Sequence, residues 1–394
     1  ILRCALQNAV KYDGKASLNA VLGLVFSLEK DVDKEKIVRD AKKIVDEVNS
    51  WNLSEQKKKL DELGEIKKKK KVAHLPDLQN VKGKVVMRFA PNPNGALTLG
   101  HCRVALWNWW LAKKHKGKFI LRFDDTSPEV KTPLKDAYKW IEKDLNWLGV
   151  KPDKIVIQSK RFGVYYKYAE KLIKIGKAYV DTLPSERMRD MLWNKEISDE
   201  REESPEIVMR KWKKMFTKYK DGEAVLRIKT DIMHPNPAVR DWIAFRIVRK
   251  GKHPLVKMKV WPMLNFASAI DDYEFSVSHI LRGSDLEVSD VRQKYVYDYF
   301  KWKYPETMHN GKFLVSGIKS TTEASELIKE GKLTGWDDPR LGTIMALKRR
   351  GFQAEAITKF VKDAGIGKND MNVNFGSLEA INRDIIDKKA NRYF

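Results

Sequence analysis

Cysteine and long apolar runs are both scarce in this sequence. Only two cysteines occur among 394 residues, Cys4 and Cys102, and they lie far apart. They exclude a disulfide framework and a zinc site made from two cysteine pairs, and they favour a reducing setting. No apolar run approaches the roughly 20 residues of a membrane-spanning helix, and the N-terminus lacks the pattern of a signal peptide. We therefore expect a cytoplasmic protein with no membrane contact and no structural metal ion.

Acidic residues are also under-represented. The chain has 53 Asp and Glu against 77 Lys and Arg, a formal net charge of +24. Such an excess suits a polyanionic partner, because each cation placed near a phosphate releases condensed counterions. A solvated basic surface explains the same charge, so composition alone leaves both interpretations open. Hydrophobic residues make up 42%, which predicts a globular chain, and the length suggests about two to four folded units.

The first 80 residues are predicted to form an N-terminal helical domain and a linker. Apolar side chains recur at helical spacing from Ile37 to Val48. The basic run Lys67 to Lys71 is typical of a solvated linker. This domain is a possible docking site for protein partners.

Short apolar strands alternate with helices after Gly83. This rhythm is typical of an α/β fold with a Rossmann-like, doubly wound parallel sheet. Thr132 is predicted to be an N-cap, with Pro133 as the first helical residue. The strands are predicted at 85–89, 119–123, 155–157 and 178–180, and the helices at 97–114, 133–148 and 162–175.

The alternation stops near residue 182 and returns at Trp261. We therefore predict a domain inserted at 182–260 between two halves of the sheet domain, 81–181 and 261–315. Residues 316–394 are predicted to be helical.

The segment Arg88 to Arg103 carries the strongest chemical signal. A strand enters a Pro- and Gly-rich turn, and a helix opens directly after it. The first turn of a helix presents unpaired N–H groups and the positive end of its dipole, which together attract anions. Thr98 and His101 lie three residues apart and share a helix face, while Gly100 lets a ligand approach the backbone. The pattern predicts a phosphate site, although it is neither a P-loop nor a dinucleotide fingerprint.

This segment closely resembles the HIGH region of class I aminoacyl-tRNA synthetases, specifically the archaeal type of glutamyl-tRNA synthetase. The tetrapeptide here is Thr98-Leu99-Gly100-His101, with Thr in place of the family's first His. Further blocks match in order and spacing from about residue 84 onward, and the first 80 residues are similar more loosely. The matching blocks are Leu121 to Thr126, Asn236 to Trp242, Trp261 to Phe266, Ile280 to Gly283 and Gly335 to Arg340.

The resemblance implies a glutamate–tRNA ligase. L-Glutamate would attack ATP, accompanied by Mg²⁺, to give glutamyl-adenylate and pyrophosphate, and the acyl group would pass to the 3′ end of tRNA(Glu) with release of AMP. It also implies that the inserted α/β domain binds the acceptor arm of the tRNA, and that residues 316–394 hold a KMSKS-like loop and a helical stem-contact region. The anticodon-reading domains of the family would follow at about residue 394, so we expect that the chain lacks them.

The resemblance also assigns site residues. Thr98, His101, Lys319 and Ser320 match catalytic positions. Arg282 would hold the side-chain carboxylate of glutamate, and Asp124 would face its ammonium group. The full ATP set is Pro91, Asn92, Gly95, Thr98, Gly100, His101, Asp285 and Lys319, and the glutamate set is Arg88, Ala90, Asn92, Asp124, Leu264, Ser268 and Arg282.

Three positions depart from the family pattern. Leu264 and Ser268 replace residues that are commonly Tyr and Asn, and Leu264 offers no hydrogen bond. The loop that matches the KMSKS motif, Gly317 to Glu323, ends in an acid where the archaeal pattern usually has Lys. This loop is either a working phosphate loop or an ordinary surface loop. Two other functions therefore stay open, a glutaminyl-tRNA synthetase and a non-catalytic tRNA-binding scaffold.

Overall fold

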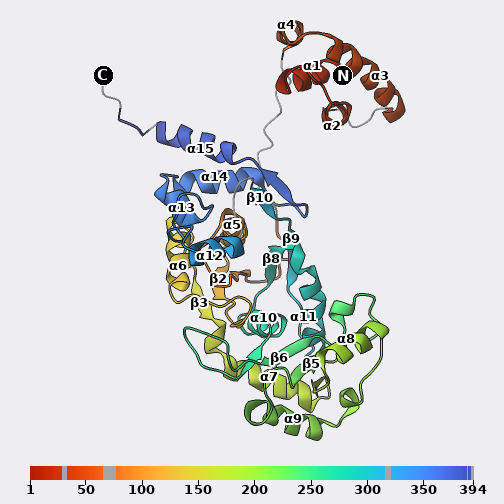
Figure 1. Ribbon diagram of the computed structural model, residues 1–394, viewed down its shortest axis with the longest axis vertical. Helices are drawn as coiled ribbons and strands as arrows, with labels where there is room; N and C mark the ends of the chain where they lie inside the picture. Colours follow the sequence, from red (N-terminus) through yellow and green to blue (C-terminus); the bar gives the residue numbers. More distant parts are fainter. Residues whose placement is uncertain (29–32, 65–76, 316–320, 388, 392–394) are drawn as a thin grey trace. The chain divides into compact units, whose positions relative to one another are not determined.

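The computed structural model describes residues 1–28, 33–64, 77–315, 321–387 and 389–391. It divides into two compact units, residues 1–72 and 73–394, which Figure 1 shows with their helices and strands labelled. The first unit contains α1 (Leu2–Lys11), α2 (Leu18–Leu28), α3 (Lys34–Ser50) and α4 (Leu53–Leu63). Leu6, Val21, Val48 and Leu60 belong to its buried core. The predicted helix at 37–48 is confirmed as part of α3.

A parallel sheet is the centre of the second unit. Strands β1 (Val86–Phe89), β2 (Lys118–Phe123) and β3 (Lys154–Ile157) pair in the order β1-β2-β3. They are linked by α5 (Leu99–Lys114) and by α6 (Ala137–Trp147). Strands β1 and β2 are buried on both faces, as expected for parallel strands covered by helices, whereas Lys154 and Ile155 of β3 are exposed. The predicted strands at 85–89, 119–123 and 155–157 are confirmed.

A second parallel pair, β8 (His279–Gly283) and β9 (Glu306–Asn310), lies on the other side of β1. Ser278 joins the two sheets, because its N–H donates to the carbonyl of Val86 at 2.9 Å. The chain therefore leaves β1 toward β2 on one side and returns to β8 on the other. Open α/β sheets bind ligands at the carboxyl ends of strands where the winding reverses in this way, which is where the turn after β1 lies.

The prediction that residues 178–180 join the parallel sheet is wrong. Strand β4 (Ala178–Asp181) instead begins an antiparallel sheet with β5 (Val225–Ile228), β6 (Ile243–Ile247) and β7 (Val260–Pro262). An apolar strand after a helix has the same local pattern in either sheet, so its sequence does not show with which strand it pairs.

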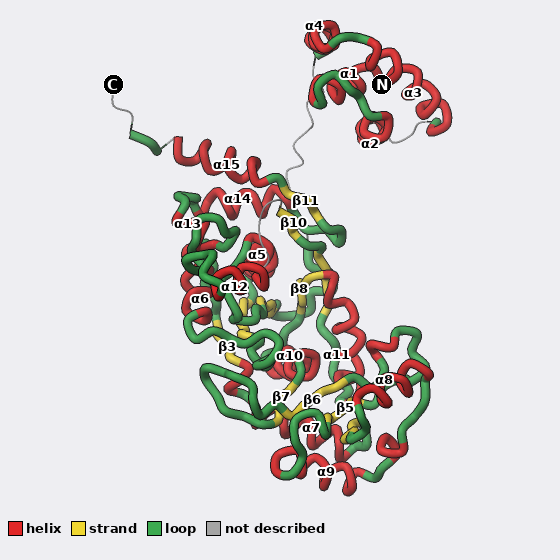
Figure 2. The backbone as a smooth tube through the Cα atoms, viewed as in Figure 1, coloured by secondary structure: helices red, strands yellow, loops and turns green. Residues whose placement is uncertain are grey.

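Helices from residues 162–217 lie around this antiparallel sheet. Figure 2 shows β5, β6 and β7 side by side, with helices α7 and α9 next to them. Tyr179, Trp212, Phe245 and Phe266 are buried in the shared core. The remaining elements here are 3₁₀ turns at Gln158–Lys160, Asp199–Glu202 and Pro237–Val239, and the helices α7 (Phe162–Lys174), α8 (Ser185–Asn194) and α9 (Pro205–Thr217).

The rest of the second unit is largely helical, as predicted for the C-terminal region, with one small parallel pair of strands. Helices α10 (Leu264–Glu274) and α11 (Glu287–Tyr299) pack against each other beside the parallel strands. A 3₁₀ turn, Ser284–Leu286, lies between β8 and α11. The C-terminal elements are β10 (Phe313–Val315), α12 (Thr321–Lys329), α13 (Ile344–Arg349), α14 (Ala354–Ala364), β11 (Met371–Val373) and α15 (Phe375–Asp387).

Thr132 is not the N-cap of a helix, contrary to prediction. Its hydroxyl donates to the carbonyl of Pro128 at 2.9 Å, and the N–H of Leu134 donates to the carbonyl of Pro93 at 2.8 Å. These bonds tie the chain to the turn after β1, so helix α6 begins only at Ala137.

Asp144 of α6 is a buried acid that sequence reasoning did not single out. It accepts a hydrogen bond from the backbone of Leu97, and its Oδ2 finds no partner among the described residues. Burial raises the pKa of Asp144 to about 7, although the charge of Lys348 opposes the shift. The hydrogen bond between Asp144 and the backbone of Leu97 therefore stabilises the chain just before α5, but burial of the charged carboxylate lowers the stability of the fold.

Asp144→Asn is expected to raise the melting temperature at alkaline pH. The folded carboxyl holds its proton up to a pKa of about 7, against 3.8 for the unfolded chain. The wild type therefore loses stability as the pH rises from about 4 to 7, whereas Asn keeps the acceptor without the charge. The gain should be absent below about pH 4 and reach roughly 3 °C or more above pH 7, measured by thermal melts across pH. An equal gain at all pH values would contradict this account.

Candidate active site

The turn after β1 is fastened by the segment that follows β2. The N–H of Asp124 donates to the carbonyl of Pro91 at 3.0 Å, and Asn92 Nδ2 donates to the carbonyl of Asp124 at 2.9 Å. Leu134 provides the third bond, to Pro93. The turn that opens α5 is therefore held from residue 91 to residue 93 by a neighbouring loop, which gives it a defined shape before any ligand binds.

His101 lies in the first turn of α5 with a fixed tautomer. Its Nδ1 accepts from the N–H of Thr98 at 3.2 Å and contacts Thr98 Oγ1 at the same distance. Burial lowers the pKa of His101 to about 4, and the Lys131 cation contributes. His101 is thus neutral near pH 7, and because Nδ1 accepts, the proton sits on Nε2. Nε2–H is a donor suited to an anion at the helix start.

The two glycines of the motif have different surroundings. A Cβ added to Gly100 would meet only Thr98 Oγ1, at 3.8 Å, so this backbone is open to a ligand. A Cβ on Gly95 would lie 2.5 Å from the ring of Trp336 and 2.8 Å from Thr321 Cγ2. Gly95 therefore has a packing role that sequence reasoning missed, since the absence of a Cβ lets the Trp336 ring approach the turn closely.

A buried cluster of charges lies beside this turn. Arg88 donates to Asp272 through Nε and Nη2, at 3.2 and 3.4 Å. Arg122 donates to both oxygens of Asp124, at 2.7 and 3.2 Å, and to Asp272 at 2.6 Å. Ser268 Oγ accepts from Arg122 at 3.0 Å and contacts Asp124 Oδ2 at 3.2 Å. Three residues predicted to bind glutamate, Arg88, Asp124 and Ser268, are thus brought together in one network.

The charged groups in this network shift one another's pKa values. Burial would raise the pKa of Asp272, but Arg88 and Arg122 outweigh it and lower the pKa. Burial raises the pKa of Asp124 despite the attraction of Arg122. Asp124 already accepts three hydrogen bonds, and a carboxylate has about four acceptor sites, so it keeps room for one more donor.

Arg122, Asp271 and Asp272 are site residues that sequence reasoning missed. Arg122 lies two positions before Asp124, so alternation along the strand would have placed both on one face. Asp271 accepts from Arg161 and Tyr165, both at 2.8 Å. Two adjacent acids near the end of a predicted helix, together with arginines in the predicted strands, could have indicated this buried cluster.

Arg282 carries an unsatisfied donor. Its Nη2 donates to Tyr304 at 2.8 Å and to Gln293 at 3.2 Å, and it pairs with Asp290. Its Nε is buried and has no hydrogen-bond partner in the part of the chain that the structure describes. Burial lowers the pKa of Arg282, and the Arg88 cation adds to this effect while Tyr304 opposes it. A carboxylate beside Arg282 would satisfy Nε and relieve the repulsion between the two guanidinium groups.

Asn92 carries the complementary unsatisfied group. Its Nδ2 is bound to Asp124, whereas its Oδ1 is buried without a partner among the described residues. Buried polar atoms are nearly always paired, so each exception calls for a ligand, a water or strain. Two of the residues predicted to bind glutamate thus carry unsatisfied polar atoms, a hydrogen-bond donor on Arg282 and an acceptor on Asn92.

The other predicted residues have plainer surroundings. Ala90 is partly buried. Leu264 is 39% exposed at the start of α10, and Asp285 is exposed in the 3₁₀ turn after β8. Lys319 and Ser320 lie outside the described residues. Glu323 lies in the first turn of α12.

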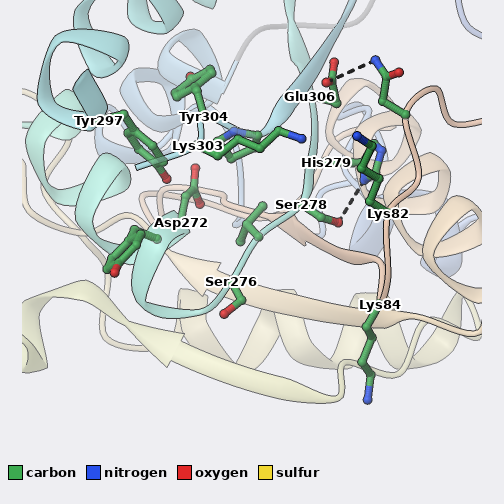
Figure 3. A pocket seen from close by; sticks show the side chains of 14 residues that line it. Lys82, Lys84, Asp272, Ser276, Ser278, His279, Tyr297, Lys303, Tyr304 and Glu306 are labelled. Atoms are coloured by element: carbon green, nitrogen blue, oxygen red, sulfur yellow. Dashed lines mark hydrogen bonds between the residues drawn. The ribbon is translucent and has the colours of Figure 1, made fainter. Parts of the chain in front are cut away.

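A cavity of about 390 Å³ adjoins this network at the opposite end of the strands. Figure 3 shows Asp272 and Tyr304 in its wall, with Lys303 extending across it and Lys84 pointing away. Asp272 and Tyr304 are the partners of Arg88 and Arg282. None of the described residues in the predicted ATP and glutamate sets lines this cavity, so it is distinct from the site built around the turn after β1.

Two basic segments of the chain, 211–220 and 348–350, contain cations that are already paired. Lys211 binds Glu200 and Glu203, at 3.0 and 2.6 Å. Arg349 pairs with Asp337 at 3.3 Å on the surface. Such pairs leave fewer free charges in the patches at 211–220 and 348–350 than the sequence indicates.

Within the described ranges, no three His, Cys, Asp or Glu side chains are grouped so that they would hold a metal ion. The same residues include no helix that is long and apolar enough to cross a membrane.

Comparisons with known proteins agree with this geometry. Residues 84–388 match the family model described as tRNA synthetases class I (E and Q), catalytic domain. A glutamate–tRNA ligase of Pyrococcus furiosus is 49% identical over 407 residues, covering 100% of this chain and 71% of that protein. The corresponding ligase of Archaeoglobus fulgidus is 45% identical over 405 residues, covering 100% and 73%.

Among solved structures, a glutamate tRNA ligase from Elizabethkingia meningosepticum in complex with its amino acid has a similar fold. The TM-score is 0.55 at 22% identity, over 77% of this chain and 70% of that one. At this identity the likeness shows the fold alone.

Proposed function

Because this chain belongs to the class I tRNA synthetases for glutamate and glutamine and is a glutamate–tRNA ligase, we propose where its two small substrates bind. Glutamate lies against Arg88, Arg282 and Asn92. The triphosphate of ATP lies at the start of α5, against Gly100 and His101. Both sites share the turn after β1, so the glutamate carboxylate and the α-phosphate meet there.

The observation that carries this proposal is the pair of orphaned atoms. Arg282 Nε and Asn92 Oδ1 are buried and have no hydrogen-bond partner among the residues that the structure describes. An amino acid with a side-chain carboxylate and an ammonium group supplies an acceptor for the first and a donor for the second. Neutral glutamine would bring no negative charge to offset the repulsion between the Arg88 and Arg282 guanidinium groups, and that repulsion costs more in a buried site than at a surface.

Catalysis then rests on positioning and charge. The attacking carboxylate oxygen forms a bond to the α-phosphorus as the bond to pyrophosphate breaks. Nε2–H of His101 and the open N–H groups of α5 stabilise the negative charge that develops on the phosphate oxygens. Enzymes of this class generally use Mg²⁺ with ATP. With no grouped metal ligands among the described residues, the ion would be held chiefly by the nucleotide's phosphates.

The tRNA is the substrate of the second step. We propose that the inserted region, 182–260, receives the acceptor arm, and that residues 316–394 contact the stem. The overall charge of +24 supports a polyanionic partner.

A direct test compares glutamate with glutamine. Purified protein, its tRNA, ATP and Mg²⁺ should give glutamyl-tRNA, and ATP–pyrophosphate exchange should depend on glutamate. The tRNA is included in both assays because this subgroup commonly needs it for activation. Preference for glutamine would overturn the glutamate site, and no exchange with either amino acid would favour a binding scaffold.

A further inference from the structure

The loop between β6 and β7, residues 248–259, reaches from the inserted region to the site. It packs on residues 124–134, the segment that fastens the turn after β1. An ion pair from the end of strand β6 lies beside this contact, because Arg246 Nη1 is 3.4 Å from Glu129 Oε2. The packing is close, since a Cβ added to Gly251 would lie 2.9 Å from Pro128 and 2.8 Å from Val248 Cγ1.

His253 is the polar centre of this contact. Its side chain is fully buried, and its Nε2 lies 3.0 Å from the carbonyl of Asp125 and 3.3 Å from Asp125 Oδ2. Its Nδ1 accepts from the N–H of Leu255 at 3.2 Å. Because Nδ1 accepts, the proton is on Nε2, which donates to Asp125. The imidazole thus joins the β6–β7 loop to the residue that follows Asp124.

Asp125 is itself fixed from the sheet side. Its carboxylate accepts from Tyr138 Oη at 2.7 Å, and from Ser159 N and Oγ at 2.8 and 2.7 Å. Among the described residues, His253 is thus the partner of Asp125 that comes from the inserted region. Asp124, whose backbone bonds hold Pro91 and Asn92, is the next residue along.

We propose that His253 is a positioning residue for glutamate activation. By holding Asp125 it fixes residues 124–134, and through their backbone bonds it fixes the turn that receives ATP and glutamate. The same loop is part of the inserted region, so a tRNA bound there acts on the activation site through His253. This inference rests on the proposed function and names the link between its two substrate sites.

The experiment compares His253→Leu with His253→Gln in the full chain, with tRNA present. Leu removes the donor, whereas Gln places an N–H near the position of Nε2. His253→Leu should lower kcat for glutamate-dependent ATP–pyrophosphate exchange by about tenfold to a hundredfold, because small displacements of a site cost this much. The Kd for tRNA should change by less than about twofold, and transfer from preformed glutamyl-adenylate should be nearly unchanged. His253→Gln should recover most of the loss.

Two further variants keep the test decisive if His253→Leu does not fold. Gly251→Ala pushes the loop away from Pro128 and should lower the same kcat in the same direction. Lys151→Ala, an exposed lysine outside the inserted region, should leave it unchanged. Exchange within about twofold of wild type in both His253→Leu and Gly251→Ala would overturn the inference, as would an equal loss of tRNA binding. If the wild type itself forms no glutamyl-tRNA, the proposed function fails instead.

Discussion

Arg282→Gln is expected to lower kcat/KM for glutamate by at least about a hundredfold. The free Nε–H of Arg282 offers the substrate carboxylate one charge-assisted hydrogen bond, which contributes about 1.5–3 kcal/mol, and the attraction of the buried cation adds to it; about 1.4 kcal/mol corresponds to a factor of ten. Gln keeps a polar group beside Tyr304 and Gln293 but removes the cation that offsets the substrate's charge. The loss should appear mainly in KM, measured by ATP–pyrophosphate exchange with tRNA present.

Two comparisons separate substrate binding from a structural role of Arg282. Asp290 pairs with Arg282 and also contacts Tyr304 and His309, so Asp290→Asn measures the effect of losing these structural contacts without removing the Arg282 cation. Arg282→Lys keeps the charge without the paired donors and should fall between wild type and Arg282→Gln. The discrimination against glutamine should decrease in Arg282→Gln. A similar loss for both amino acids would show that Arg282 only supports the fold.

His101→Ala is expected to slow adenylate formation by about a hundredfold, the usual cost of removing one donor that stabilises developing charge. Because His101 acts on the phosphate, KM for glutamate should stay within about threefold of wild type. The variant should remain folded, since the ring bonds only to Thr98 among the described residues. Pre-steady-state measurement of adenylate formation gives the rate directly.

The pH dependence distinguishes a neutral donor from a cationic one. The pKa of His101 is lowered to about 4 by burial and Lys131, so its charge does not change between pH 5 and 8. The wild-type rate should therefore show no break near pH 6.5 that disappears in His101→Ala. Such a break would mean that His101 is cationic during catalysis and that it is less buried in the working enzyme than in this structure. Thr98→Val, which removes only the hydroxyl, should have a smaller effect than His101→Ala.

Local patterns in the sequence were sufficient for the elements that form the site. The apolar run at 85–89, the Pro and Gly turn after it and the helical spacing from residue 97 each depend on neighbours along the chain. The face shared by Thr98 and His101 follows from helix geometry alone. For this reason the turn, the helix and the two side chains on it could be predicted before their surroundings were known.

Local patterns in the sequence could not show which distant segments of the chain pair with each other. Residues 178–180 have the composition of a strand in either sheet, and only the tertiary structure shows that β4 pairs with β5. Thr132 and Pro133 resemble a helix start, yet their segment is bound to the turn at Pro93, some 40 residues earlier in the chain. In both cases a contact with a distant residue outweighed a valid local preference.

The sequence by itself determined the family, the strand–turn–helix that receives phosphate, and the residue types that suit an acidic amino acid. The tertiary structure alone decided which charges are free. It pairs Arg88 with Asp272, binds Asp124 to Arg122 and leaves Arg282 Nε and Asn92 Oδ1 unsatisfied. The physical reason is that hydrogen bonding and burial depend on which segments meet in space, whereas backbone preference and side-chain chemistry are properties of each residue and its neighbours.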